Sequence, residues 1–154
     1  MASRSGYAEI SVFAHATEDL DKVKLAVLRV LPEELADRVR FCEYAMTGHN
    51  DNLIVELRVE LHSRADAYQA LQAILVGISL LEQTALEDEF SKHLDERKRL
   101  FLRLDKQKAF QGEAVLASVD AISFTFRLPS RPKSLRQLKE DLATYTEYGR
   151  RGWS

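Results

Sequence analysis

The sequence predicts one α+β domain of two layers, with helices packed on one face of a largely antiparallel, open sheet. Several short segments alternate apolar and polar residues, as half-buried strands do. The segments between them have an apolar stripe on one side, as helices that cover a sheet do. A chain of 154 residues suits a single domain, and two layers bury the apolar side of every element.

The first third of the chain predicts two strands and a helix. We expect a strand over residues 7–16, a helix that Thr17 caps, a strand over residues 39–46 and a turn over residues 47–52. Pro32 either ends the helix or starts a second short turn. Threonine is a common helix N-cap, and proline interrupts a helix. The alternation of the first strand would bury Ile10, Val12 and Ala14.

The clearest strand runs from Leu53 to His62. Its odd-numbered residues up to Leu61 are all apolar, whereas most of its even-numbered residues are charged. Such strict alternation predicts one buried side and one side in contact with solvent. We therefore expect the odd-numbered side chains in the core and Arg58 on the surface.

The rest of the chain predicts helices and two more strands. We expect a helix that Ser63 caps, a less regular continuation over residues 78–94, strands over residues 99–105 and 121–128, and a last helix from Ser134 to Tyr145. The domain would span residues 7–148. Residues 1–6 and 149–154 are expected to be flexible ends.

The composition favours a cytoplasmic protein without membrane contact. No apolar run reaches the roughly 18 residues that a membrane span requires. The first six residues are polar and no apolar segment of a secretory signal follows them. The single cysteine, Cys42, can form no internal disulfide, which fits a reducing compartment.

The sequence lacks the residue patterns of common enzymes. No phosphate loop, dinucleotide-binding glycine pattern or nucleophile elbow is present. The four histidines are scattered; His15 and His62 could meet across the sheet, but surface histidines are far commoner than metal sites. We expect no catalytic residues, no metal and no cofactor.

Basic residues concentrate in the last third of the chain. Residues 1–96 hold 9 Lys/Arg and 18 Asp/Glu, whereas residues 97–154 hold 13 Lys/Arg and 6 Asp/Glu. The densest segment contains Arg97, Lys98, Arg99, Phe101, Arg103, Lys106, Gln107 and Lys108. Cations beside an outward aromatic suit RNA. Charge that protects an edge strand from aggregation would explain the same segment without RNA.

The predicted strands share an outward face of charged, hydroxyl and aromatic residues. Its expected members are Phe13, His15, Arg58, Phe101, Arg103, Ser123, Thr125 and Arg127. Because the helices cover the other side, this face would be open to solvent or to a partner. Arg58 and Arg127 are therefore added to the candidate RNA-binding residues, although Glu56 and Glu60 would oppose an anion locally.

The segment Arg103-Leu104-Asp105-Lys106-Gln107, followed by Ala109 and Gly112, resembles a family of archaeal RNA-binding proteins described as exosome-associated subunits. The family is similar in fold to the large-subunit ribosomal protein that holds 5S rRNA. The Thr17-Glu18-Asp19 helix start, the Gly48-His49 turn and the strand from residue 120 to 128 agree with it. The resemblance spans about residues 7–130. It departs at Asp51-Asn52-Leu53, where the family often has Gly-Asn-Pro.

The resemblance implies RNA binding, in RNA processing or ribosome biogenesis, and brings no catalytic residue with it. The outward residues suit phosphates and 2′-hydroxyls better than base faces, so we expect structured RNA to be preferred. The alternative is a protein–protein adaptor or dimerisation module of an RNA-processing complex, which pairs through the open sheet or an edge strand.

Overall fold

The computed structural model describes residues 6–150, with the side chains of residues 6–144. Most of the two ends that the sequence predicts to be flexible therefore lies outside the described residues. Gly149 and Arg150, which the sequence analysis assigns to the C-terminal tail, continue the last helix.

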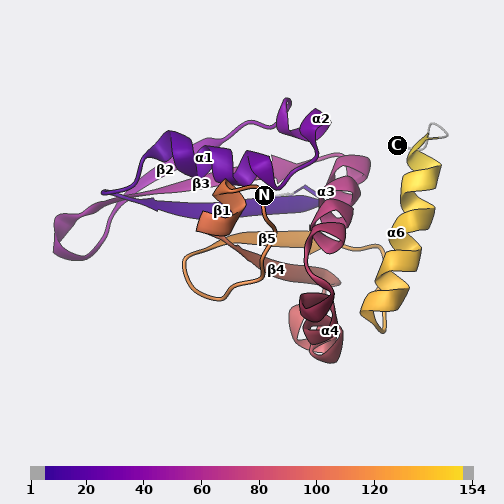
Figure 1. The fold of residues 1–154 in the computed structure, drawn as a ribbon. Helices are drawn as coiled ribbons and strands as arrows, with labels where there is room; N and C mark the ends of the chain where they lie inside the picture. The colour runs from indigo at the N-terminus through magenta and orange to yellow at the C-terminus, as the bar shows by residue number, and fades with distance from the viewer. Residues whose placement is uncertain (1–5, 151–154) are drawn as a thin grey trace.

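Five strands form one sheet in which every neighbouring pair is antiparallel. They are β1 (Ala8–His15), β2 (Cys42–Thr47), β3 (Leu53–Leu61), β4 (Arg99–Asp105) and β5 (Ala121–Arg127). The order is β2-β3-β1-β5-β4. The β2–β3 hairpin extends beyond the rest of the sheet (Figure 1).

The helices lie on one face and at one end of this sheet (Figure 1). They are α1 (Leu20–Arg29), α2 (Glu33–Ala36), α3 (Arg64–Gly77), α4 (Leu80–Asp88), α5 (Lys106–Phe110) and α6 (Leu135–Arg150), with short 3-10 turns η1 (His49–Asp51) and η2 (Phe90–His93). α5 packs against α1, and α6 packs against α3. The prediction of a two-layer α+β domain with an open antiparallel sheet is confirmed.

The core lies between the sheet and the helices, as the alternation predicts, but it ends before the tip of β3. Leu57, Val59 and Leu61 are buried, whereas Val55 is partly buried and Leu53 is 54% exposed. The prediction that Leu53 is buried is wrong because the hairpin projects past the helix layer (Figure 1). Alternation reports which side of a strand a residue occupies, not whether a helix covers it there.

Two helix starts differ in how well the sequence predicted them. Asp19, not Thr17, caps α1, and its carboxylate accepts a hydrogen bond from the amide of Asp21 (2.9 Å). Ser63 caps α3 as expected, accepting from the amide of Asp66 (3.3 Å). Both Thr and Asp are common N-caps, so local chemistry alone does not choose between neighbouring candidates.

Within residues 6–150, no single helix is long and apolar enough to cross a bilayer. α3 and α4 meet the requirement of length and composition only when they are taken together, and the chain bends by 114° between them. α3 buries residues along most of its length against the core of the domain.

Candidate nucleic-acid interface

The strand order decides which outward side chains become neighbours. We call the sheet side away from the helices the open face. One row of residues crosses it through all five strands, and its members are Cys42, Arg58, Ser11, Ser123 and Arg103. Arg58 on β3 and Arg103 on β4 are therefore three strand spacings apart in the sheet. They lie on different parts of the open face and do not form one site.

Three arginines gather where β4 and β5 pair. Arg99 lies opposite Arg127, Phe101 opposite Thr125, and Arg103 opposite Ser123. We call these six residues the arginine patch. None of them carries a negative charge. Like charges directly opposite each other on paired strands destabilise a sheet, and the ion pair of Arg99 with Asp95 offsets this repulsion between Arg99 and Arg127.

Each arginine of β4 is held by a neighbour. The Arg99 side chain donates to Asp95 (2.7 Å) and lies over the Phe101 ring, 5.5 Å from its centroid. Arg103 reaches the carbonyl of Ser118 (3.4 Å). These contacts orient the guanidinium groups, which lowers the entropy that a ligand must remove when it binds.

The tight turn before β4 brings two more cations to the same end of the sheet. Asp95 accepts from the amides of Arg97 and Arg99 (2.9 Å each), and Lys98 adopts a left-handed conformation (φ 65°). Desolvation alone would raise the pKa of the Asp95 carboxyl. The hydrogen bonds from Arg99 and Arg97 outweigh it and hold this pKa below its usual value. Arg97 and Lys98 are exposed.

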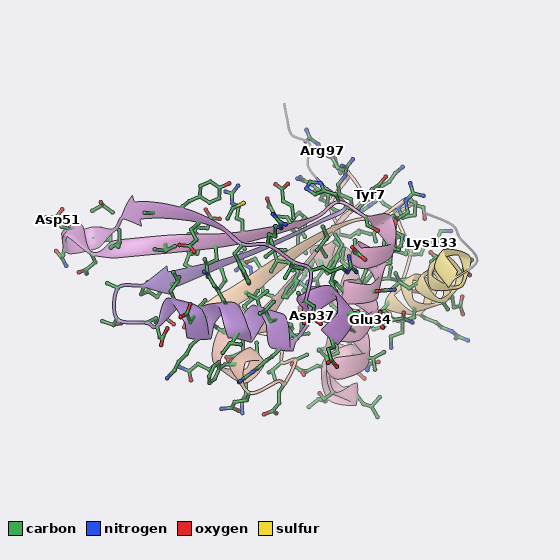
Figure 2. All side chains as sticks on the ribbon, turned by 90° about the horizontal axis from the view of Figure 1, so that it is seen from above. Tyr7, Glu34, Asp37, Asp51, Arg97 and Lys133 are labelled. Atoms are coloured by element: carbon green, nitrogen blue, oxygen red, sulfur yellow. The ribbon has the colours of Figure 1, made fainter. Side chains whose placement is uncertain are left out.

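Two backbone hydrogen bonds place this turn beside the arginine patch. The amide of Leu128 donates to the carbonyl of Lys98 (2.8 Å), and the amide of Arg127 donates to that of Tyr7 (2.8 Å). Arg97 lies near the Tyr7 end of the sheet, on the side away from Glu34 and Asp37, whereas Asp51 marks the distant hairpin tip (Figure 2).

β4 is the last strand of the sheet, yet its outer edge is covered. The amides of Asp95 and Ala117 donate to the carbonyls of Arg99 and Arg103 (3.0 Å each), and His93 contacts the carbonyl of Phe101 (3.0 Å). Because the covering segments already block pairing with another strand, edge protection does not require the arginines. This removes the main reason for the alternative explanation of the basic segment.

Lys106 occupies a different environment from the other predicted site residues. It is 4% exposed, and its ammonium donates to Glu18 (3.0 Å), to Asp120 (2.9 Å) and to the carbonyl of Phe13 (2.8 Å). All three hydrogens of an ammonium group have acceptors in this arrangement. Lys106 therefore joins α5 to the start of α1 and to the loop before β5, and we leave it out of the interface.

Gln107 and Lys108 follow on α5 and are exposed, but α5 belongs to the helix layer (Figure 1). They lie on the other side of the sheet from the arginine patch. The basic segment of residues 97–108 thus divides between two faces of the domain, which a linear count of its charges does not show.

The motif behind the family resemblance builds the turn from β4 into α5. Asp105 caps the helix by accepting from the amide of Lys108 (2.8 Å), and Ala109 is fully buried. Gly112 has a φ of 85°, a conformation that glycine adopts without strain. These residues specify a strand-to-helix junction, and Arg103 is the exposed cation among them.

The structure also brings forward a residue that sequence reasoning missed. Tyr44 on β2 lies on the open face opposite Glu56 and contacts Arg58, whose guanidinium is 5.1 Å from the ring centroid. The alternation in residues 42–47 is too weak to assign faces. Only the pairing register of β2 against β3 would have placed Tyr44 on the open face. Predicting that register requires the centre of the hairpin turn to be known.

The histidines do not assemble a site. His15 lies opposite Ile54, and His62 follows Leu61, which pairs with Ala8 at the other end of the same strands. Across the part of the chain that the structure describes, no group of three or more His, Cys, Asp or Glu side chains could hold a metal ion.

Comparison with known proteins supplies the family. A family model described as RNA binding matches residues 7–128, which is most of the chain. The chain belongs to this RNA-binding family. The RNA-binding protein PAB1135 of Pyrococcus abyssi is 29% identical over 125 residues, which cover 80% of this chain and 81% of that protein.

Crystal structures of two archaeal DUF54 proteins have the same fold as this member of the RNA-binding family. SSO0741 from Sulfolobus solfataricus has a TM-score of 0.71 and 25% identity, and the match covers 92% of this chain and 98% of that one. AF2318 from Archaeoglobus fulgidus has a TM-score of 0.70 and 25% identity, covering 92% and 99%. The match extends over almost the whole of either relative.

Proposed function

We propose that this family member is a non-catalytic protein that binds structured RNA through the arginine patch together with Arg97 and Lys98. One observation carries the proposal: three arginines on adjacent strands surround one exposed aromatic ring, and two of them face each other. Arg103 and Arg127 would neutralise phosphates, Arg99 would donate a hydrogen bond while it pairs with Asp95, and the hydroxyls of the patch suit riboses.

The shape of the patch favours a folded RNA. Neighbouring strands lie about 4.8 Å apart and alternate residues about 7 Å apart, so the three arginines extend over roughly 14 Å in one direction and 5 Å in the other. This narrow strip suits one line of phosphates and 2′-hydroxyls along a helical groove edge. Phe101 offers a single ring, too few for a run of stacked bases.

A charge-removal variant tests the interface. We expect Arg97→Ala, Arg103→Ala and Arg127→Ala together to weaken binding of an RNA hairpin, since three phosphate contacts are lost. The slope of log affinity against log salt should become shallower by about 2–3, because fewer counterions are released on binding. The measurement is fluorescence anisotropy of a labelled hairpin at several salt concentrations.

Two control variants make the result specific. Arg136→Ala removes an exposed arginine of α6 and should change neither affinity nor slope. Gln107→Ala with Lys108→Ala removes the predicted site residues of the helix layer. If this second variant weakened binding and the triple variant did not, the interface would lie on the helix side of the domain and the proposal would be refuted.

For the cellular setting we propose RNA processing or ribosome biogenesis in the cytoplasm, in contact with exosome subunits. The resemblance at Arg103–Gln107 and the RNA-binding family support this setting. Crosslinking in cells, followed by sequencing of the attached RNA and identification of attached proteins, tests it. Recovery of mature messenger RNA alone, without precursors or ribosomal RNA, would contradict the proposal.

A second candidate function is self-association through β2. All six residues of β2 are exposed, and within residues 6–150 no backbone hydrogen bond reaches its outer edge. An uncovered edge can pair with a strand of another chain. Sedimentation analysis of the protein and of Ala45→Pro, which removes one amide donor from β2, distinguishes a dimer from a monomer.

A further inference from the structure

The end of the open face near the hairpin tip has a different character from the arginine patch. Phe13 of β1 is 43% exposed, Tyr44 of β2 is 48% exposed and Met46 of β2 is 40% exposed. Tyr44 and Phe13 lie on either side of Glu56, in one row across β2, β3 and β1. We call Phe13, Tyr44 and Met46 the aromatic platform.

Polar contacts beside the platform hold the Tyr44 ring in place. Glu56 is 9% exposed and accepts from the hydroxyl of Ser11 (2.7 Å) and from the Arg58 guanidinium (3.0 Å). Arg58 in turn lies against the Tyr44 ring. Burial alone would raise the pKa of the Glu56 carboxyl, but the hydrogen bonds from Arg58 and Ser11 outweigh it and lower this pKa. The carboxylate therefore stays ionised near neutral pH.

Arg58 pairs with both Glu56 (3.0 Å) and Glu9 (4.0 Å), so among the described residues the platform has no unpaired cation beside it. Exposed rings without such a cation attract base faces rather than phosphates, because stacking is independent of charge and tolerant of sequence. The pre-ordered Tyr44 ring loses little further freedom when a base stacks on it.

The platform also adjoins the arginine patch. Phe13 lies two residues along β1 from Ser11, whose row leads through Ser123 to Arg103. From strand spacing and residue rise, Phe13 is about 12 Å from Arg103, and Tyr44 about 10 Å further across the sheet. An RNA whose phosphates lie on the patch can therefore place nearby unpaired nucleotides on the platform.

We propose that the aromatic platform stacks unpaired bases that flank the RNA helix held by the arginine patch. This inference rests on the RNA interface proposed above and extends it: the ligand is a helix next to a single-stranded segment, and bases contribute affinity independently of salt. Elsewhere, the highly exposed aliphatic side chains Val76, Leu80 and Leu81 lie at the α3–α4 corner, a composition that suits protein contacts better than bases.

The test compares three RNAs that share one stem. The first is a blunt hairpin, the second has an unpaired extension of about five nucleotides, and the third has the same extension built from abasic sites. The abasic extension keeps every phosphate and removes every base. Extensions at the 5′ and at the 3′ end are tested separately, and affinity is measured by anisotropy at several salt concentrations.

The wild-type protein should bind the base-bearing extension about tenfold more tightly than the abasic one, as expected for about one stacked base. Tyr44→Ala and Phe13→Leu should each reduce this preference several-fold without changing the salt slope. Phe13→Leu keeps an apolar side chain at a strand position, and Tyr44→Phe should retain the preference. Leu80→Ala, a truncation of an exposed apolar residue on α4, should have no effect.

The possible results separate this inference from the proposed function. Equal affinity for base-bearing and abasic extensions, with the salt-dependent loss in the arginine variant still present, would refute the platform and leave the patch. An altered oligomeric state in Tyr44→Ala, with unchanged RNA preference, would make the platform a protein interface. Absence of binding to all three RNAs would overturn both.

Discussion

The buried ammonium of Lys106 offers a direct test of the structure. In Lys106→Met the side chain keeps most of its volume but loses three hydrogen bonds, two of them to carboxylates. Removing one partner of a buried ion pair costs about 3–5 kcal/mol. Because Glu18 and Asp120 are 30% and 49% exposed and regain water, we expect about 2–3 kcal/mol of lost unfolding free energy.

For a domain of this size, that loss corresponds to a melting temperature lower by about 5–10 °C. Urea denaturation measures the free energy, and Lys108→Met, two residues later on the exposed side of α5, is the matched control and should stay within about 0.5 kcal/mol. RNA affinity of the Lys106 variant, measured well below its melting temperature, should equal that of the wild type. A variant of unchanged stability and reduced RNA affinity would show that Lys106 contacts RNA, and would refute the structural role.

Three further predictions concern the core, the pH response and metals. Leu57→Ala should cost about 2–5 kcal/mol in urea denaturation, through lost burial and a cavity, and Arg58→Ala about 1 kcal/mol because Glu56 loses a partner; the reverse ranking would mean that the two faces of β3 are exchanged. Since the pKa of Glu56 is lowered by folding, its contribution is present above the unfolded value, near 4.5, and is lost as pH falls through the folded value. Glu56→Gln should therefore flatten the loss of stability in acid, and an identical acid profile would contradict this. Dialysis against a chelator should leave the melting temperature unchanged, whereas a fall that zinc reverses would reveal a metal site.

Local patterns predicted the elements of the fold but not their contacts. The alternation in residues 53–61 is written in adjacent residues, so the strand and its faces follow directly. Burial of Lys106 depends on Glu18, Phe13 and Asp120, which are distant in the sequence and meet only once five strands are ordered. A charge count cannot distinguish such a lysine from a surface cation.

The candidate site shows the same division. Arg103 and Arg127 were predicted to face outward from their own strands, and pairing of β4 with β5 brings them together with Arg99. Tyr44 was missed because its face depends on the register of β2 against β3. Register is a non-local property of a hairpin, and a slip of one residue would move the ring to the opposite side.

The unequal edges of the sheet determine how it could grow. Among residues 6–150 the β4 edge is covered and the β2 edge is not, so an added strand can pair beside β2. Two copies joined there as antiparallel neighbours are related by an axis perpendicular to the sheet, which keeps both open faces on the same side. The product would be one continuous surface with an arginine patch at each far end. Such a surface would bind a long or two-fold symmetric RNA at two points. Because the second patch binds an RNA that the first patch already holds nearby, the overall affinity would rise without any new contact.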